Sequence, residues 1–155
     1  CGQCGCLEAL ASDVAVVTAA AAAVEAGRST SLVDAHSIDL RAIIEAADAG
    51  DPYARELLAE SGRWLGVGVA TLINLLNPQR VIVAGEGVEA GEWRLAPMRA
   101  AIDELRFEAA GAETEIIVES AGDITWARGA ACVILGEFFK SPLHRDRPAP
   151  NVAAP

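Results

Sequence analysis

The stretch LINLLNPQRVIVAGEG, residues 72–87, sets the expected fold, because a helix ends in it and a buried strand follows. Asn77-Pro78 ends a helical spacing of apolar residues that begins at Pro52, since proline cannot continue a helix. Val81 to Val83 form a short apolar run without alternation, which is typical of a fully buried parallel strand. The strand leads into the turn Ala84-Gly85-Glu86-Gly87, so we expect a ligand-facing strand end there.

Helices are expected on the N-terminal side of this stretch. An alanine-rich run predicts a helix over about residues 13–26. Asp39 can cap a second helix, which Gly50 ends, and Asp51-Pro52 then gives the start signal of the long helix. We interpret three glycines within that long helix as positions of close packing: Gly62, Gly66 and Gly68.

On the C-terminal side the pattern predicts a helix over about 95–106, a strand over 115–119 and a last helix over 125–139. Two short strands separated by a helix fit one right-handed βαβ unit. A two-stranded sheet is not stable by itself, so we expect partner strands in an upstream part of the protein. The proline-containing tail, residues 142–155, is expected to be disordered.

The composition excludes several classes of protein. The 155 residues carry 22 acidic and 12 basic side chains, a net charge of −10, which argues against a surface that neutralises nucleic-acid phosphates. A hydrophobic fraction of 52 % and a charged fraction of 22 % are those of a globular domain, or of one lobe of a larger protein. No apolar run approaches the roughly 20 residues that span a bilayer. The chain starts at Cys1 without a visible secretory signal, and we expect that an upstream segment is missing.

Three of the four cysteines, Cys1, Cys4 and Cys6, lie within six residues. This spacing disfavours a disulfide framework and indicates thiolates that converge on a metal, although free thiols at a chain end are the alternative. A structural zinc site normally has four protein ligands. His36 and Cys132 are the other possible ligands, but His36 lies in a serine-rich linker typical of solvated side chains, and Cys132 is expected on the buried face of the last helix.

Four sequence blocks, in this order, resemble the ROK family, named for repressors, open reading frames and sugar kinases. They are CGxxGCLEALAS at 1–12, Gly50-Asp51-Pro52, LINLLNPQRVIVAGEG at 72–87, and WARGAA at 126–131. The resemblance extends to about Phe139. In either branch of the family, we expect Trp126 to pack in the core.

The resemblance implies an α/β fold, the C-terminal helix-rich lobe of an actin-like (ribonuclease-H-like) ATPase-type fold with an incomplete parallel sheet. Residues 1–12 would then be the remnant of a zinc-binding loop, residues 13–141 the lobe, and residues 142–155 the disordered tail.

The family binds zinc through a His and three Cys, and the resemblance implies part of that site here. Cys1 matches the second of the family's cysteines and Cys6 the third, while the His and the first Cys would precede residue 1. Cys4 matches a variable position, although it could substitute in a truncated chain. Zinc is the expected cofactor, with an incomplete site in this chain.

Glu8 matches the family glutamate that accepts hydrogen bonds from sugar hydroxyls. An ionised carboxylate offers several acceptor positions to vicinal hydroxyls, which supports that role. The alternative is a first-turn glutamate that the helix dipole stabilises.

The turn Ala84-Gly85-Glu86-Gly87 matches the place where kinases of the family carry a Gly-Gly pair that approaches adenine nucleotide. Ala84 replaces the first glycine, and Glu86 brings a negative charge, so we interpret the turn as a degenerate nucleotide site. The continuation of this turn and the WARGAA segment are more similar to the sugar-responsive repressors.

Two functions follow as hypotheses. The first is the C-terminal fragment of the sugar-binding effector domain of a cytoplasmic ROK-family transcriptional regulator, homo-oligomeric when full length, with DNA contacted only through a missing N-terminal helix-turn-helix. The second is the C-terminal lobe of an ATP-dependent, glucokinase-like hexose kinase, whose catalytic Asp would lie upstream. In both, the fragment has no catalytic residue, and ATP is a ligand only in the second. A sugar is the expected small-molecule partner, and no membrane partner is expected.

Overall fold

The computed structural model of the chain describes residues 5–107, 114–120 and 123–139. The predictions for Cys1, Cys4 and the tail at 142–155 therefore lie outside the described residues. The chain divides into two compact units after Ser120. The elements of the first unit are α1 (Leu7–Ala11), α2 (Asp13–Glu25), η1 (Ser31–Asp34), α3 (Leu40–Asp48), α4 (Pro52–Leu76), β1 (Arg80–Gly85), η2 (Glu86–Ala90), α5 (Glu92–Leu105) and β2 (Glu115–Ser120).

The predicted helix starts are confirmed. Ser12, Asp39 and Asp51 cap α2, α3 and α4, each accepting backbone N–H bonds from the first turn of its helix at 2.8 to 3.1 Å. Asp51 is followed by a proline at the first helical position, as the start signal predicts. The short α1 was not predicted, because Ser12 alone separates it from α2, ending one helix and beginning the next.

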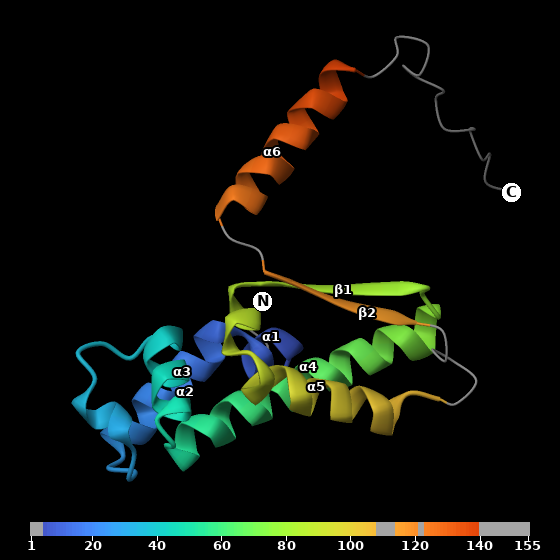
Figure 1. Cartoon of the computed structure of the whole chain (residues 1–155). Helices are drawn as coiled ribbons and strands as arrows, with labels where there is room; N and C mark the ends of the chain where they lie inside the picture. Colours follow the sequence, from blue (N-terminus) through green and yellow to red (C-terminus); the bar gives the residue numbers. More distant parts are fainter. Residues whose placement is uncertain (1–4, 108–113, 121–122, 140–155) are drawn as a thin grey trace, which may run out of the picture. The chain divides into compact units, whose positions relative to one another are not determined.

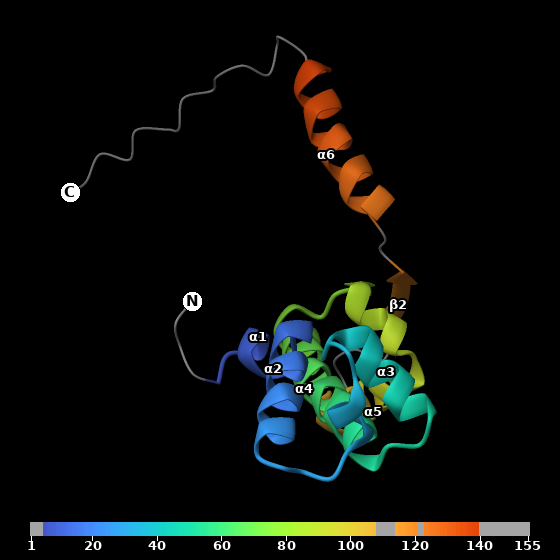
Figure 2. The ribbon, with the colours of Figure 1, turned by 90° about the vertical axis from the view of Figure 1, so that its left-hand side faces the viewer.

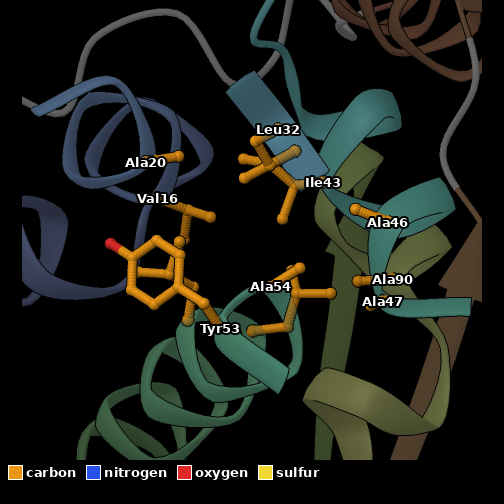
Figure 3. Close-up of a cluster of buried hydrophobic side chains, with 11 residues drawn as sticks. Val16, Ala20, Leu32, Ile43, Ala46, Ala47, Tyr53, Ala54 and Ala90 are labelled. Atoms are coloured by element: carbon orange, nitrogen blue, oxygen red, sulfur yellow. The ribbon is translucent and has the colours of Figure 1, made fainter. Parts of the chain in front are cut away.

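The first of two hydrophobic clusters joins the N-terminal helices to the start of α4 (Figure 3). Figure 2 shows α1 and α2 lying against α4. Ile43 and Leu58 are fully buried in this cluster, and the burial of each side chain stabilises the fold by about 1.5 to 3 kcal/mol. Besides Ile43, the members labelled in Figure 3 are Val16, Ala20, Leu32, Ala46, Ala47, Tyr53, Ala54 and Ala90.

The second cluster lies between α4, α5 and the sheet. Its buried members are Val69, Ile73, Leu95, Met98 and Ile102. The two helices approach closely because α4 has glycines at the contact: a Cβ at Gly62 would overlap the Arg94 backbone, and one at Gly66 would lie 2.5 Å from the Met98 carbonyl oxygen. The prediction that these glycines allow close packing is confirmed.

The sheet consists of β1 and β2, which pair in parallel from Arg80 opposite Glu115 to Gly85 opposite Ser120, with α5 in the connection (Figure 1). Val81 and Val83 pack on the second cluster, whereas Ile82 is 58 % exposed. The predicted parallel pairing is confirmed, but the prediction of a fully buried strand is wrong. Within the first unit, α4 and α5 lie on one face of the sheet, and no described residue of that unit covers Ile82 fully.

The second unit contains α6 (Asp123–Phe138), close to the predicted bounds. Trp126 is 71 % exposed and Cys132 is also exposed, so the predictions that these side chains are buried are wrong for the described residues. Within its own unit, α6 has no other described element to pack against, so the apolar side chains around its circumference are exposed there. None of the helices in the described part of the chain is long and apolar enough to cross a membrane.

Candidate functional site

Helix α1 carries Glu8, the candidate sugar-binding residue. The helix begins after the half-buried Cys6, and Glu8 lies exposed in its first turn. No hydrogen bond or ion pair engages the Glu8 carboxylate from any residue in the described ranges. The carboxylate is therefore available to an external donor, and it also has the first-turn position that the alternative interpretation requires.

Both ends of α1 are fixed against the rest of the unit. Leu7 packs against Gly68 of α4, where a Cβ would lie 2.5 Å from a methyl carbon of the leucine. At the other end, the buried carbonyl of Ala11 accepts a hydrogen bond from the Ser61 hydroxyl at 3.1 Å and another from the Arg94 guanidinium. Glu8 thus lies on a short helix held by contacts on either side of it.

The predicted turn lies at the carboxyl end of β1 and lines a cavity of about 190 Å³. Gly85 has a φ of +124°, which an L side chain rarely adopts, so a glycine is required where β1 passes into η2. The lining residues are Asp13, Leu65, Val83, Ala84, Gly85, Glu86, Gly87, Val88, Arg94 and Leu95. Pockets for small molecules usually measure about 300 to 1,000 Å³, so the cavity within this chain is smaller than a nucleotide would need.

An ion pair of the chain itself occupies the space beside Gly87. Arg94 Nη1 donates to Asp13 Oδ1 at 2.5 Å and to the Gly87 carbonyl at 3.2 Å. A Cβ at Gly87 would overlap the Arg94 guanidinium and lie 2.7 Å from Asp13 Oδ1. The absence of a side chain at Gly87 therefore accommodates Arg94 and Asp13. Nucleotide binding at this turn stays a prediction.

The structure brings together only part of the predicted set. Cys6 and Glu8 lie on α1, and all four residues of the turn line the cavity, but Glu8 is not among the lining residues. Cys1 lies outside the described residues. In the part of the chain that the structure describes, no group of three His, Cys, Asp or Glu side chains could hold a metal ion.

Sequence reasoning missed Arg94 and Ser61. Arg94 is 4 % exposed and Ser61 is also buried. A signal existed, since Arg94 precedes Met98 by four residues and therefore lies on the apolar face of α5. An arginine on an apolar face needs buried hydrogen-bond acceptors, so this spacing identifies Arg94 as a buried polar residue.

Asp51 is the remaining buried charged residue of the described ranges. Its Oδ2 accepts hydrogen bonds from the Thr30 hydroxyl at 2.7 Å and from the Ser31 amide at 2.6 Å and hydroxyl at 2.8 Å. Burial alone would raise the pKa of Asp51, but these hydrogen bonds, with that of the Ala54 amide, outweigh it and hold the pKa well below its usual range. Asp51 joins the loop at Thr30 to the start of α4.

Comparison with known proteins identifies the family. Residues 1–137 match the model of the ROK family. The chain belongs to the ROK family. It is 30 % identical over 145 residues to a xylose repressor of Caldicellulosiruptor bescii, covering 92 % of this chain and 36 % of the repressor. This ROK chain thus spans about a third of that relative's length.

Solved ROK structures have the same fold. A ROK transcriptional regulator described as a homologue of the Escherichia coli MLC protein matches with a TM-score of 0.74 at 28 % identity, over 86 % of this chain and 34 % of the regulator. A ROK glucokinase of Streptomyces griseus, in complex with glucose and AMPPNP, matches with a TM-score of 0.69 at 30 % identity, over 86 % of this chain and 45 % of the kinase. The predicted family and the actin-like ATPase-type fold are confirmed.

Proposed function

We propose that this ROK chain is the C-terminal part of the sugar-binding effector domain of a transcriptional regulator, and that Glu8 accepts hydrogen bonds from the sugar hydroxyls. The observation that carries the proposal is the carboxylate of Glu8, which no residue of the described ranges engages, on a helix anchored at Leu7 and at Ala11. A preorganised carboxylate binds vicinal hydroxyls without first losing a partner of its own. The similarity to the xylose repressor along 92 % of the chain supports the regulator.

DNA would be bound by another part of the protein. The net charge of −10 disfavours phosphate contacts by this chain, and a helix-turn-helix upstream of Cys1 would supply them. We expect the full-length regulator to be a cytoplasmic homo-oligomer, since regulators of this kind bind paired DNA half-sites.

Zinc would hold the start of α1. Cys6 is a half-buried thiol next to the first turn that carries Glu8, which suits a thiolate ligand, and Cys1 would be the second ligand. The other two ligands would precede residue 1. Bound zinc would supply a fixed cross-link there, and metal analysis of the purified full-length protein would measure its stoichiometry.

A sugar kinase is the second candidate, and the likeness to the Streptomyces griseus glucokinase favours it. Two features of the chain weigh against it. Arg94 and Asp13 fill the space beside Gly87, and Glu86 is an exposed negative charge next to the place where phosphates would lie. The carboxylate of Glu86 would repel the negatively charged phosphates, which would lower the affinity for a nucleotide.

The test is calorimetric titration of the full-length protein with glucose, N-acetylglucosamine, mannose and xylose. For whichever sugar binds, Glu8→Gln should lower the affinity about tenfold to a hundredfold, because a charge-assisted hydrogen bond is worth about 1.5 to 3 kcal/mol. Its melting temperature should stay unchanged. Glu60→Gln, an exposed glutamate on α4, is the matched control and should bind like the wild type.

Wild-type affinity in Glu8→Gln, with a lowered melting temperature, would make Glu8 a first-turn residue only. Sugar-dependent release of ADP from ATP by the full-length protein would favour the kinase over the regulator.

A further inference from the structure

Arg94 makes an extensive set of buried polar contacts from α5. Its guanidinium donates to Ser61 Oγ at 2.9 Å through Nε, to Asp13 and the Gly87 carbonyl through Nη1, and to the Ala11 carbonyl through Nη2. An arginine has five N–H donors in a fixed planar fork, so these acceptors must keep one arrangement to be served together. The contacts join α1 and α2, α4, and η2 to α5.

Two glycines make room for this arrangement. Gly62 lets the backbone of α5 at Arg94 contact α4, and Gly87 lets the guanidinium reach Asp13. Ser61, next to Gly62, is thereby brought within hydrogen-bond distance of Arg94. The close approach of α4 and α5 therefore determines where the guanidinium lies.

The contacts meet at the junction between α1 and α2. The Ala11 carbonyl is the last of α1, and Asp13 is the first residue of α2. Gly87 belongs to the turn at the end of β1. A single side chain thus links the helix that carries Glu8 to the turn that lines the cavity, two segments more than 70 residues apart in sequence.

We propose that Arg94 is a positioning residue for Glu8: by binding Ala11, Asp13 and Gly87 together, it fixes the direction of α1 relative to the turn after β1 and so sets the affinity for the sugar. The proposal rests on the proposed role of Glu8. A five-residue helix has too few internal hydrogen bonds to hold its own orientation, so that orientation must come from tertiary contacts.

A hydrophobic replacement separates positioning from stability. Removing one partner of an ion pair is costly only where the remaining charge is left buried without compensation. In Arg94→Met, the Ala11 carbonyl keeps its bond from Ser61, and Asp13 is about one-third exposed and can be hydrated. Adding Gly87→Ala fills part of the space that the guanidinium leaves, and Asp13 Oδ1, which would lie 2.7 Å from the new Cβ, can turn toward water. The same substitution without Arg94→Met should strain the turn.

The experiment uses the full-length protein with Arg94→Met and Gly87→Ala combined, and with Arg94→Lys as a second variant that keeps the charge. We expect the double variant to melt close to the wild type but to bind the sugar about tenfold more weakly. The amides of α1 should exchange with deuterium about tenfold faster, while those of α4 stay protected. Arg94→Lys should change both quantities less. Arg99→Met, on the exposed side of the same helix, is the matched control and should change neither.

Unchanged exchange in α1, or unchanged affinity despite faster exchange, would overturn the proposal. If none of the four sugars binds the wild-type protein, the proposed function fails. In that case faster exchange in α1 of the double variant still supports Arg94 as the residue that positions α1, and unchanged exchange overturns it.

Discussion

Asp51 illustrates how one buried residue can fix a long connection. One of its carboxylate oxygens caps α4, and the other accepts three hydrogen bonds from Thr30 and Ser31. The residue is only 7 % exposed, and hydrogen bonds supply all of its compensation. The link between the loop and α4 therefore depends on the carboxyl group being ionised.

This dependence predicts how stability varies with pH. Because the hydrogen bonds hold the pKa of Asp51 below its unfolded value, its contribution is fully present above about pH 4 and is lost as the pH falls further toward the folded pKa. Asp51→Asn should lower the free energy of unfolding at pH 7 by about 1.5 to 3 kcal/mol and flatten its dependence on pH in the acid range. Urea unfolding of the wild type and the variant between pH 3 and 7 measures both effects.

Asp34→Asn is the control, since Asp34 is exposed in η1. An equal acid dependence in wild type and Asp51→Asn would show that other carboxylates control it.

The packing of α4 against α5 is decisive for the arrangement of the elements. The glycines of α4 differ in what faces them. Gly66 faces the backbone of Met98, which cannot move without shifting α5, whereas Gly68 faces the end of the Leu7 side chain, which can rotate.

We therefore expect different costs in stability for two glycine-to-alanine substitutions in one helix. Gly66→Ala should destabilise the protein by about 1 to 3 kcal/mol, because overpacking separates the helices. Gly68→Ala should change stability by less than about 1 kcal/mol, since the helix propensity gained offsets the adjustment of Leu7. Denaturant unfolding of the two variants checks the difference, and equal costs would contradict it.

The elements were largely predictable from local signals. The caps at Ser12, Asp39 and Asp51, the end at Asn77-Pro78 and the parallel pairing of the strands follow from side-chain chemistry and periodicity. The division of α1 from α2 was not, because Ser12 fits the end of one helix and the start of the next equally well.

Tertiary contacts were much harder to predict from the sequence. The helical spacing places Arg94 on the apolar face of α5, but its acceptors lie up to 83 residues away in the sequence, so no local pattern identifies them. The prediction that Ile82, Trp126 and Cys132 are buried was wrong. Apolar residues in a sequence indicate side chains that favour burial, but they do not indicate which segment packs against them. At the candidate site, the turn was predicted to face a ligand, and a cavity lies there. The ion pair between Arg94 and Asp13, which occupies the space beside Gly87, was not predicted.

On the scale of the whole molecule, the sheet is the part that this chain leaves incomplete. Among the described residues it has two strands, and Ile82 on one face is mostly exposed within a chain that spans about a third of the xylose repressor. Parallel sheets usually have both faces covered, and cover on the second face would bury this residue.

Ile82→Asn should therefore destabilise the full-length protein by about 1.5 to 3 kcal/mol, the cost of losing a buried aliphatic side chain. Val33→Asn, in η1, should cost much less, because that side chain lies in a connecting segment. Thermal melts of both full-length variants make the comparison, and equal costs would argue that the outer face of β1 stays open to solvent.

The parallel pairing of β1 with β2 also determines the order in which the chain can fold. Arg80 and Glu115, the first partners of the ladder, are 35 residues apart, so a large loop must close before the first strand–strand bond forms. The contacts between α4 and α5 close loops of similar size, since Ser61 and Arg94 are 33 residues apart, but α5 precedes β2 in the chain and can dock first during synthesis. During synthesis β1 therefore emerges before β2, and its backbone N–H and C=O groups stay unpaired until β2 is made. Docking of α5 on α4 places the following segment next to β1, where β2 can pair with it.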